Sequence, residues 1–194
     1  MVTATLAALL LAPITLTDVQ VYGRCQAKLD KVTRLTYEVH GYEGEKYKGL
    51  YGKMSIDLKR GYTFGEPPKW RTVCDLKRIW SKYEDGTKHV EPTDGWDSIS
   101  NVLGFDIIPG RFSPDFRRDK AQILQFDKRR CYAINPKYGE SPLVSYTIYV
   151  DSKTWLPAGY SESQMGESGG TIAYRNVKLN PKLAPSLFVV PNNS

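Results

Sequence analysis

The last third of the chain alternates apolar and polar positions, as a half-buried β-strand does. The clearest run covers residues 144–150, where every second side chain is apolar. Turn-forming residues then separate three further runs, which lie around Tyr160, over residues 171–179 and over residues 187–190. Four strands joined by hairpin-sized connections predict an antiparallel meander.

Helical spacing occurs near the start of the chain. Residues 18–31 place apolar side chains three or four positions apart, so one stripe of the predicted helix is apolar. Asp18 is the expected N-cap, because its carboxylate can accept a hydrogen bond from the first turn. Strands are then predicted in the runs that begin near Leu35, Met54, Tyr62, Trp70, Lys77, Ala121 and Arg130.

The run that begins at Lys53 has the most regular alternation in the chain. Successive side chains of a strand point to opposite faces, so one face of this strand is expected to be apolar and the other to meet water. The residues predicted to face inward are Met54, Ile56 and Leu58, and those predicted to face outward are Lys53, Asp57 and Lys59.

The pattern changes after Pro92. Thr93 can cap a short helix that ends at Gly104, and the apolar residues of this insertion fall on one side of it. They either complete a packed core or act as a lid over a hydrophobic ligand site. These residues are Trp96, Ile99, Val102 and Leu103, with Phe105 directly after the helix.

The order of elements predicts an α+β fold. A helix, a set of strands, a helical insertion and a second set of strands fit one strongly curved antiparallel sheet, an unclosed β-barrel. Both helices, over residues 18–31 and 93–103, are expected to pack on its concave side. Tyr146, Ile148 and Val150 should face that side together with the inward residues of the strand at 53–59.

The first 17 residues carry no charged side chain and contain an apolar core at residues 6–12. This core is shorter than the roughly 20 residues of a membrane-spanning helix, so we interpret residues 1–17 as a signal peptide. Residues 18–194 are expected to form one domain. Because no Lys or Arg precedes the apolar core, a buried or amphipathic terminal segment is the alternative.

Charge and composition limit the partners. The net charge is +6, but the 27 basic residues are interleaved with 21 acidic ones along the whole chain. Nucleic-acid binding is therefore not expected. Cys25, Cys74 and Cys131 do not have the spacing of metal ligands, and we interpret them as buried structural residues. The alternative in an oxidising compartment is one disulfide, with Cys74 and Cys131 the first candidates.

The sequence contains no catalytic motif, so we expect neither an enzyme nor a cofactor. The two histidines, His40 and His89, lie in or beside predicted strands and are interpreted as structural or exposed residues. Glu38, Glu43 and Glu45 are the carboxylates that acid–base chemistry would need, but their place beside a turn favours surface charge.

From residue 143 onward the chain has a strand that ends at Asp151, the segment Thr154-Trp155-Leu156-Pro157, a returning strand, the glycines at 166–170 and the closing residues 188–191. This pattern resembles the end of LolA-type periplasmic lipoprotein carriers. Two earlier segments are also similar to the family. They are Gly52-Lys53-Met54-Ser55-Ile56, followed by Lys59-Arg60, and Asp75-Leu76-Lys77-Arg78-Ile79-Trp80, in which Leu76 replaces the family's glycine.

The resemblance implies an exported, periplasmic monomer that holds the acyl chains of lipoproteins or lipids in a hydrophobic cavity. A membrane-bound donor or acceptor protein is the implied partner. Arg60 matches the family's arginine that holds or releases a helical lid. The same fold also serves lipid-sensing regulatory modules, so a sensor is the alternative to a carrier. The expected ligand-binding residues are Met54, Ile56, Leu58, Trp96, Ile99, Leu103, Phe105, Tyr146 and Ile148.

Overall fold

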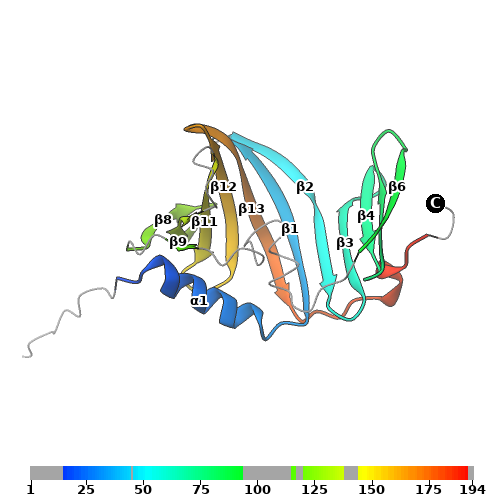
Figure 1. The fold of residues 1–194 in the computed structure, drawn as a ribbon, viewed down its shortest axis with the longest axis horizontal. Coiled ribbons are helices and arrows are strands. Elements are labelled where there is room, and N and C mark those ends of the chain that lie inside the picture. The colour runs from blue at the N-terminus through cyan, green and yellow to red at the C-terminus, as the bar shows by residue number, and fades with distance from the viewer. Residues whose placement is uncertain (1–14, 45, 94–114, 117–119, 138–143, 192–194) are drawn as a thin grey trace, which may run out of the picture.

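The computed structural model of the chain describes residues 15–44, 46–93, 115–116, 120–137 and 144–191. Eleven strands form one antiparallel sheet in the order β6-β5-β4-β3-β2-β1-β13-β12-β11-β9-β8, and β7 pairs with β10 in a separate ladder. Figure 1 shows the sheet curving around helix α1. The elements are α1 (Asp18–Leu29), β1 (Arg34–Glu43), β2 (Lys46–Asp57), β3 (Gly61–Glu66), β4 (Trp70–Cys74), β5 (Arg78–Lys82), β6 (Lys88–Pro92), β7 (Asp115–Phe116), β8 (Gln122–Phe126), β9 (Arg129–Ile134), β10 (Pro136–Lys137), β11 (Val144–Asp151), β12 (Pro157–Gln164), β13 (Glu167–Leu179) and the 3₁₀-helix η1 (Pro185–Phe188).

The predicted α+β fold with a strongly curved, unclosed antiparallel sheet is confirmed. The sheet is open because its two outermost strands, β6 and β8, do not pair with each other. More than one helix was expected on the concave side, and within the described residues α1 is the α-helix found there. The helix expected over residues 93–103 lies almost entirely outside them.

The N-cap of helix α1 is one residue earlier than the sequence predicts. It is Thr17, whose side chain accepts from the Gln20 N–H while the Gln20 side chain accepts from the Thr17 N–H. This reciprocal pair is a capping box. Asp18 instead lies in the first turn, where its carboxylate accepts a hydrogen bond of 2.9 Å from the Asn135 N–H. The expected cap therefore ties the helix to the sheet.

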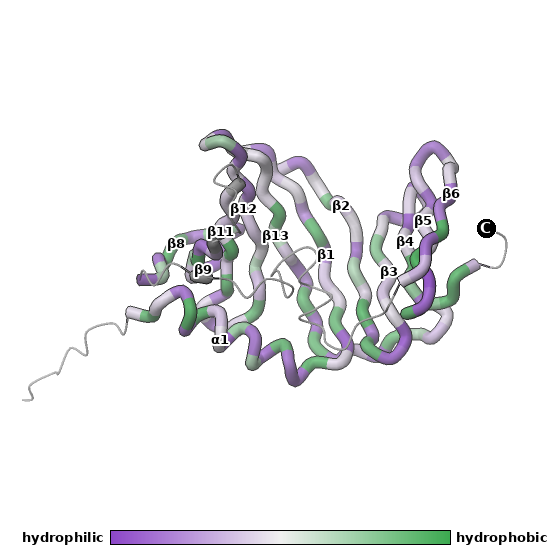
Figure 2. The backbone as a smooth tube through the Cα atoms, viewed as in Figure 1, coloured by the Kyte–Doolittle hydropathy of each residue, from purple (hydrophilic) through white to green (hydrophobic). Residues whose placement is uncertain are grey.

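The apolar stripe of α1 fills the concave side of the sheet. Val21, Cys25 and Leu29 are fully buried, and they belong to one core cluster with inward-facing residues of β1, β2, β9, β11 and β13. Full burial of a Val or Leu side chain contributes about 1.5–3 kcal/mol to folding, so this stripe holds the helix in place. Figure 2 shows hydrophobic segments alternating with hydrophilic ones along β1, β2 and β13.

Three of the four strands predicted in the last third are present as β11, β12 and β13, with the expected antiparallel pairing. The fourth prediction is wrong, because residues 185–188 form the 3₁₀-helix η1. Pro185 lies in its first turn, and Phe188 and Val190 are buried against the sheet. Val190 packs with Val73 and Trp80, so burial rather than strand pairing accounts for this apolar run.

Two further predictions are wrong. Asp57 was expected to face solvent, but it is buried at the end of β2, where it accepts hydrogen bonds from the Lys59 N–H and from Arg60 Nη1. A disulfide between Cys74 and Cys131 is excluded, because all three cysteines are free and buried. Cys74 lies on β4 and Cys131 on β9, and six strands separate β4 from β9 in the sheet.

Candidate functional site

The residues predicted to line a cavity divide into two groups. Met54, Ile56 and Ile148 are buried in the core cluster beneath α1, and Leu58 packs against that cluster. In the structure they are close-packed core residues. Tyr146 is half-buried farther along β11, 6.2 Å from Tyr160 between ring centroids. Trp96, Ile99, Leu103 and Phe105 lie outside the described residues.

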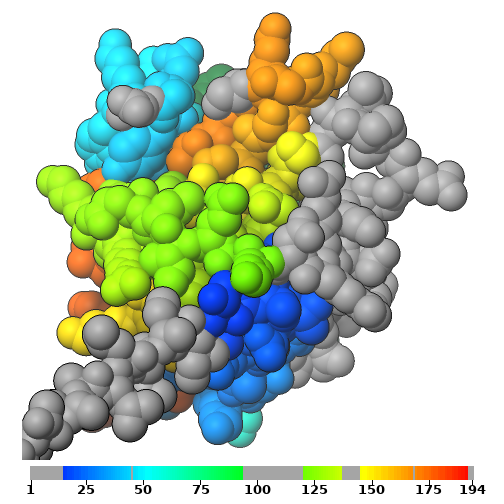
Figure 3. Space-filling model, turned by 90° about the vertical axis from the view of Figure 1, so that its left-hand side faces the viewer, coloured from blue at the N-terminus to red at the C-terminus, as the bar shows by residue number. Residues whose placement is uncertain are grey.

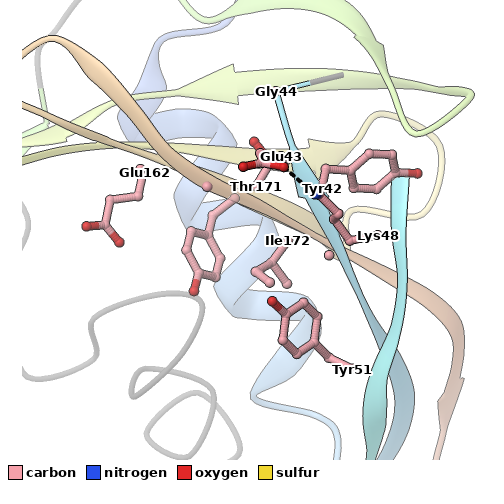
Figure 4. Close-up of a pocket in the computed structure, with 12 residues that line it drawn as sticks. Tyr42, Glu43, Gly44, Lys48, Tyr51, Glu162, Thr171 and Ile172 are labelled. Carbon is pink, nitrogen blue, oxygen red and sulfur yellow. Dashed lines mark ion pairs between the residues drawn. The ribbon is translucent and has the colours of Figure 1, made fainter. Parts of the chain in front are cut away.

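A pocket of about 680 Å³ lies beyond this core, between the end of the β1–β2 hairpin and the β12–β13 hairpin (Figure 4). Its side-chain lining comes largely from the concave face, and four of its positions are glycines. The lining residues are Gly41, Tyr42, Glu43, Gly44, Lys48, Tyr51, Tyr160, Glu162, Gly169, Gly170, Thr171 and Ile172.

The deeper row of the pocket is apolar and aromatic. Strand register places Tyr160 beside Ile172 and Ile172 beside Gly41, so these positions cross β12, β13 and β1 on one face. The ring of Tyr51 covers Gly41, where an added Cβ would overlap Cε2 and Cδ2 of the tyrosine. Tyr160 and Ile172 also pack against the core cluster, so this row continues the concave face toward α1.

The outer row of the pocket carries the charges. Glu162 pairs in register with Gly170, and Glu43 follows Tyr42, the last residue of β1 that pairs with β13. Glu43 and Glu162 therefore stand on either side of Gly170, which has no side chain to fill the space between them. Lys48 forms an ion pair with Glu43 (Figure 4), and its hydrogen bond and charge hold the pKa of Glu43 below its ordinary value.

Glu162 is the carboxylate of the pocket that makes no ion pair among the described residues. It lies opposite Tyr146 in the β11–β12 register. Burial and then the charge of Glu162 raise the pKa of the Tyr146 hydroxyl. The pocket thus combines an apolar, aromatic interior with a rim of two carboxylates and one lysine, and its formal charge is negative by one.

The opposite face of the same strands is fixed by a polar network. Tyr42 donates to Asp127 at 2.7 Å, and Arg175 donates to Tyr42 Oη at 2.6 Å and to both oxygens of Asp127. Arg129 forms a further ion pair with Asp127 at 3.1 Å. Because Asp127 lies in the β8–β9 turn, the network ties that hairpin to β1 and β13 behind the pocket. Figure 3 shows the hairpin in green beside α1 in blue.

Asp127 is held in its charged form. Burial alone would raise its pKa, but the hydrogen bonds from Arg175 and Tyr42 and the charges of Arg175 and Arg129 hold the pKa below its ordinary value. Hydrogen bonding to Asp127 in turn raises the pKa of Arg175. The network is therefore an ionic clamp that supports the pocket from the opposite face of the sheet.

Arg60, the predicted lid-control residue, lies at the other end of the sheet from the pocket rim. Its Nη1 is 3.4 Å from Asp57 Oδ2 and 3.5 Å from the carbonyl oxygen of Leu183. Among the described residues it joins the end of β2 to the segment before η1.

The pocket residues were not predicted as a site, although the sequence holds a signal for them. Gly41 lies inside β1, and Gly169 and Gly170 lie inside β13; glycine inside a strand marks a place where a backbone, ring or ligand approaches closely. Tyr51 gave no signal, because a β-bulge between Gly52 and Leu50 changes the face on which it lies.

Comparisons with known proteins give similarity of fold. No family model matches the sequence, and no curated protein matches it. An uncharacterized conserved protein from Thermus thermophilus superposes with a TM-score of 0.56 at 11% identity, over 90% of this chain and 94% of that one. A LolA superfamily protein from Nitrosomonas europaea, NE2245, gives 0.37 at 10% identity, over 90% and 98%. MucB in the Pseudomonas aeruginosa MucA/MucB complex gives 0.44 at 9% identity, over 90% of this chain and 61% of that one.

The fold agrees with the expectation drawn from the sequence. The open, strongly curved antiparallel sheet with a helix packed on its concave side is the architecture that the sequence resemblance implies, and the resemblance is confirmed at this level. A search of the described residues for a helix of sufficient length and apolarity to cross a membrane found none.

Proposed function

We propose that the protein is a non-catalytic carrier of amphiphiles, which binds acyl chains of lipoproteins or lipids on the concave face of its sheet. The observation that carries this proposal is the pocket of about 680 Å³ whose apolar row continues into the concave face. Small-molecule sites typically have volumes of about 300–1,000 Å³ and are lined by apolar and aromatic groups with a few polar ones.

The magnitudes fit reversible binding. Removing apolar surface from water contributes about 25 cal/mol per Å², so an acyl segment that buries a few hundred Å² gains several kcal/mol. Ordering the chain and losing its free translation cost part of this gain. The balance corresponds to a dissociation constant in the micromolar range, which suits a protein that must release its cargo.

The other site residues predicted from the sequence are proposed to lie along or beside the route of the acyl chain. The acyl chain enters past Tyr51 and Ile172 and extends toward Tyr146. Contact with Met54, Ile56 and Ile148 requires α1 to move away from the core, because these side chains are close-packed under it. Trp96, Ile99, Leu103 and Phe105 are proposed as lid residues, and Arg60 as the residue that holds the lid. The proposed compartment is the periplasm.

The experiment is a titration with a fluorescent fatty-acid analogue. The parent protein should show saturable uptake, and Tyr51→Ala should weaken it because the variant removes an aromatic wall of the pocket. Tyr83→Ala is the matched control, since the two tyrosines are similarly exposed, at 55% and 50%, but Tyr83 lies beyond β5, outside the pocket. Absence of saturable uptake by the parent protein would overturn the proposal.

Transfer of the bound ligand to a membrane distinguishes a carrier from a sensor. A carrier loaded with the analogue should pass it to acceptor vesicles, with a rate that increases with vesicle concentration. A sensor should retain the ligand and change its affinity for a protein partner instead. Retention of bound analogue in the presence of excess vesicles would contradict the carrier assignment while leaving the binding site intact.

A further inference from the structure

The outer row of the pocket carries two carboxylates and one lysine. Glu43 on β1 and Glu162 on β12 flank Gly170 on β13, and the ring-lined row of Tyr51, Ile172 and Tyr160 lies directly beneath them. Adjacent strands are about 4.8 Å apart, so the backbones that carry the two carboxylates are roughly 10 Å apart. A small ionic headgroup fits between them.

The charges of this row do not cancel. Lys48 is engaged by Glu43, whereas Glu162 makes no ion pair among the described residues. An anionic headgroup placed over Gly170 would meet the carboxylate of Glu162 and find the nearby ammonium already neutralised. A cationic headgroup would meet an unpaired carboxylate on one side and the Glu43–Lys48 pair on the other.

The aromatic row favours the same charge. Tyr51 and Tyr160 line the pocket immediately below the carboxylates. A cation within about 6 Å of a tyrosine ring is attracted by the quadrupole of the ring. The apolar body of the ligand and its positive end are therefore both accommodated, in that order from the core outward.

We infer that the preferred ligand is an amphiphile with a positively charged amine headgroup, whose ammonium lies between Glu162 and the Glu43–Lys48 pair while its chain extends over Ile172. The inference rests on the proposed function, since it requires the pocket to bind an acyl chain. It adds the chemistry of the headgroup, and it assigns Glu162 as the residue that determines specificity.

The size of the preference is modest. Glu162 is partly exposed, and a single ion pair in such a position contributes about 1 kcal/mol or less. We therefore expect an ammonium amphiphile to bind about three- to fivefold more tightly than a neutral one of the same chain. An anionic amphiphile should bind more weakly than the neutral one. Both differences should decrease as the salt concentration rises.

The test compares dodecylammonium, dodecanol and dodecanoate at pH 7, each as a competitor of a neutral fluorescent probe and each below its micelle concentration. The expected order of affinity is ammonium, then alcohol, then carboxylate. Glu162→Gln should remove most of the preference for dodecylammonium over dodecanol and leave the affinity for dodecanol unchanged. The matched control is Glu167→Gln, which changes an exposed carboxylate of the β12–β13 hairpin outside the pocket.

The outcomes separate the inference from the proposed function. Equal affinities for the three amphiphiles, or an ammonium preference that is undiminished in Glu162→Gln, would overturn the inference while acyl binding stands. Failure of all three to displace the probe, together with no saturable uptake of the fatty-acid analogue, would overturn the proposed function itself.

Discussion

The ring of Tyr51 lies directly over Gly41, so that a Cβ at position 41 would overlap Cε2 of the tyrosine. Two strands approach in this way only because β2 bulges next to Gly52 and turns Tyr51 onto the concave face. The glycine thus creates the space that the ring uses, and the ring forms one wall of the pocket.

Gly41→Ala should displace the Tyr51 ring and weaken binding of the fatty-acid analogue about fivefold, as expected for the loss of an aromatic contact of roughly 1 kcal/mol. Gly23→Ala is the control, because a Cβ at Gly23 in α1 meets no atom within 4 Å. This control should bind normally and gain up to about 1 kcal/mol of stability from its helix propensity. Unchanged binding by folded Gly41→Ala would contradict the role of Tyr51.

Leu76 should be a site of stored backbone strain. Its φ is 70°, in the left-handed region where a side chain costs about 1–2 kcal/mol, and the LolA-type hairpin that it resembles has glycine there. Leu76→Gly should therefore raise the free energy of unfolding by about 0.5–1 kcal/mol after the entropic cost of glycine. Urea denaturation measures the change. Lys77→Gly, at a neighbouring position without positive φ, should lower the stability instead.

The strands were more predictable than the pocket, for a physical reason. The hairpin at Asp127 and Lys128 follows from local chemistry, because two residues with positive φ form the turn between β8 and β9 and aspartate tolerates that conformation. Inward positions such as Ile56 and Ile148 follow from the period of two. The bulge that moves Tyr51 to the concave face breaks this period, so alternation could not place its ring beside Ile172.

The alternation of polar and apolar residues misled the prediction of burial where a polar side chain has a specific partner. Asp57 has the spacing of a solvent-facing residue, yet its carboxylate is buried and satisfied by Lys59 and Arg60. Trp155 makes contacts that were not predicted from the sequence: its φ is 59°, and its ring stacks on Tyr132 beneath the guanidinium of Arg24. Contacts between residues so distant in sequence depend on the packing of the whole domain, which local patterns do not encode.

The three cysteines should be unreactive in the native protein. Burial raises the pKa of Cys25 to about 12 and, as the largest cause, that of Cys74 and Cys131 to about 11, so almost no thiolate is present at pH 8. A thiol reagent should label none of them within minutes in buffer and all three in denaturant. Labelling of fewer than three in denaturant without reductant would reveal a disulfide and contradict the structure.

The ionic clamp should make stability depend on pH in the acid range. The folded pKa of Asp127 is depressed, so the clamp contributes its full stability above the unfolded value of about 3.9 and loses it as the pH falls through that value toward the lower folded pKa. Asp127→Asn should cost about 2 kcal/mol at pH 7, because it removes charge-assisted hydrogen bonds to Arg175 and Arg129. Asparagine tolerates the positive φ of this turn, so the hairpin itself should persist.

Urea denaturation at pH 7, 5, 4 and 3 tests this dependence. The parent protein should lose part of its advantage over Asp127→Asn between pH 5 and pH 3, and the two stability curves should approach each other as the pH falls. Glu167→Gln, an exposed substitution, should follow the parent curve throughout that range. A constant difference between the parent protein and Asp127→Asn at every pH would mean that the charge of Asp127 is not what stabilises the β8–β9 hairpin against β1 and β13.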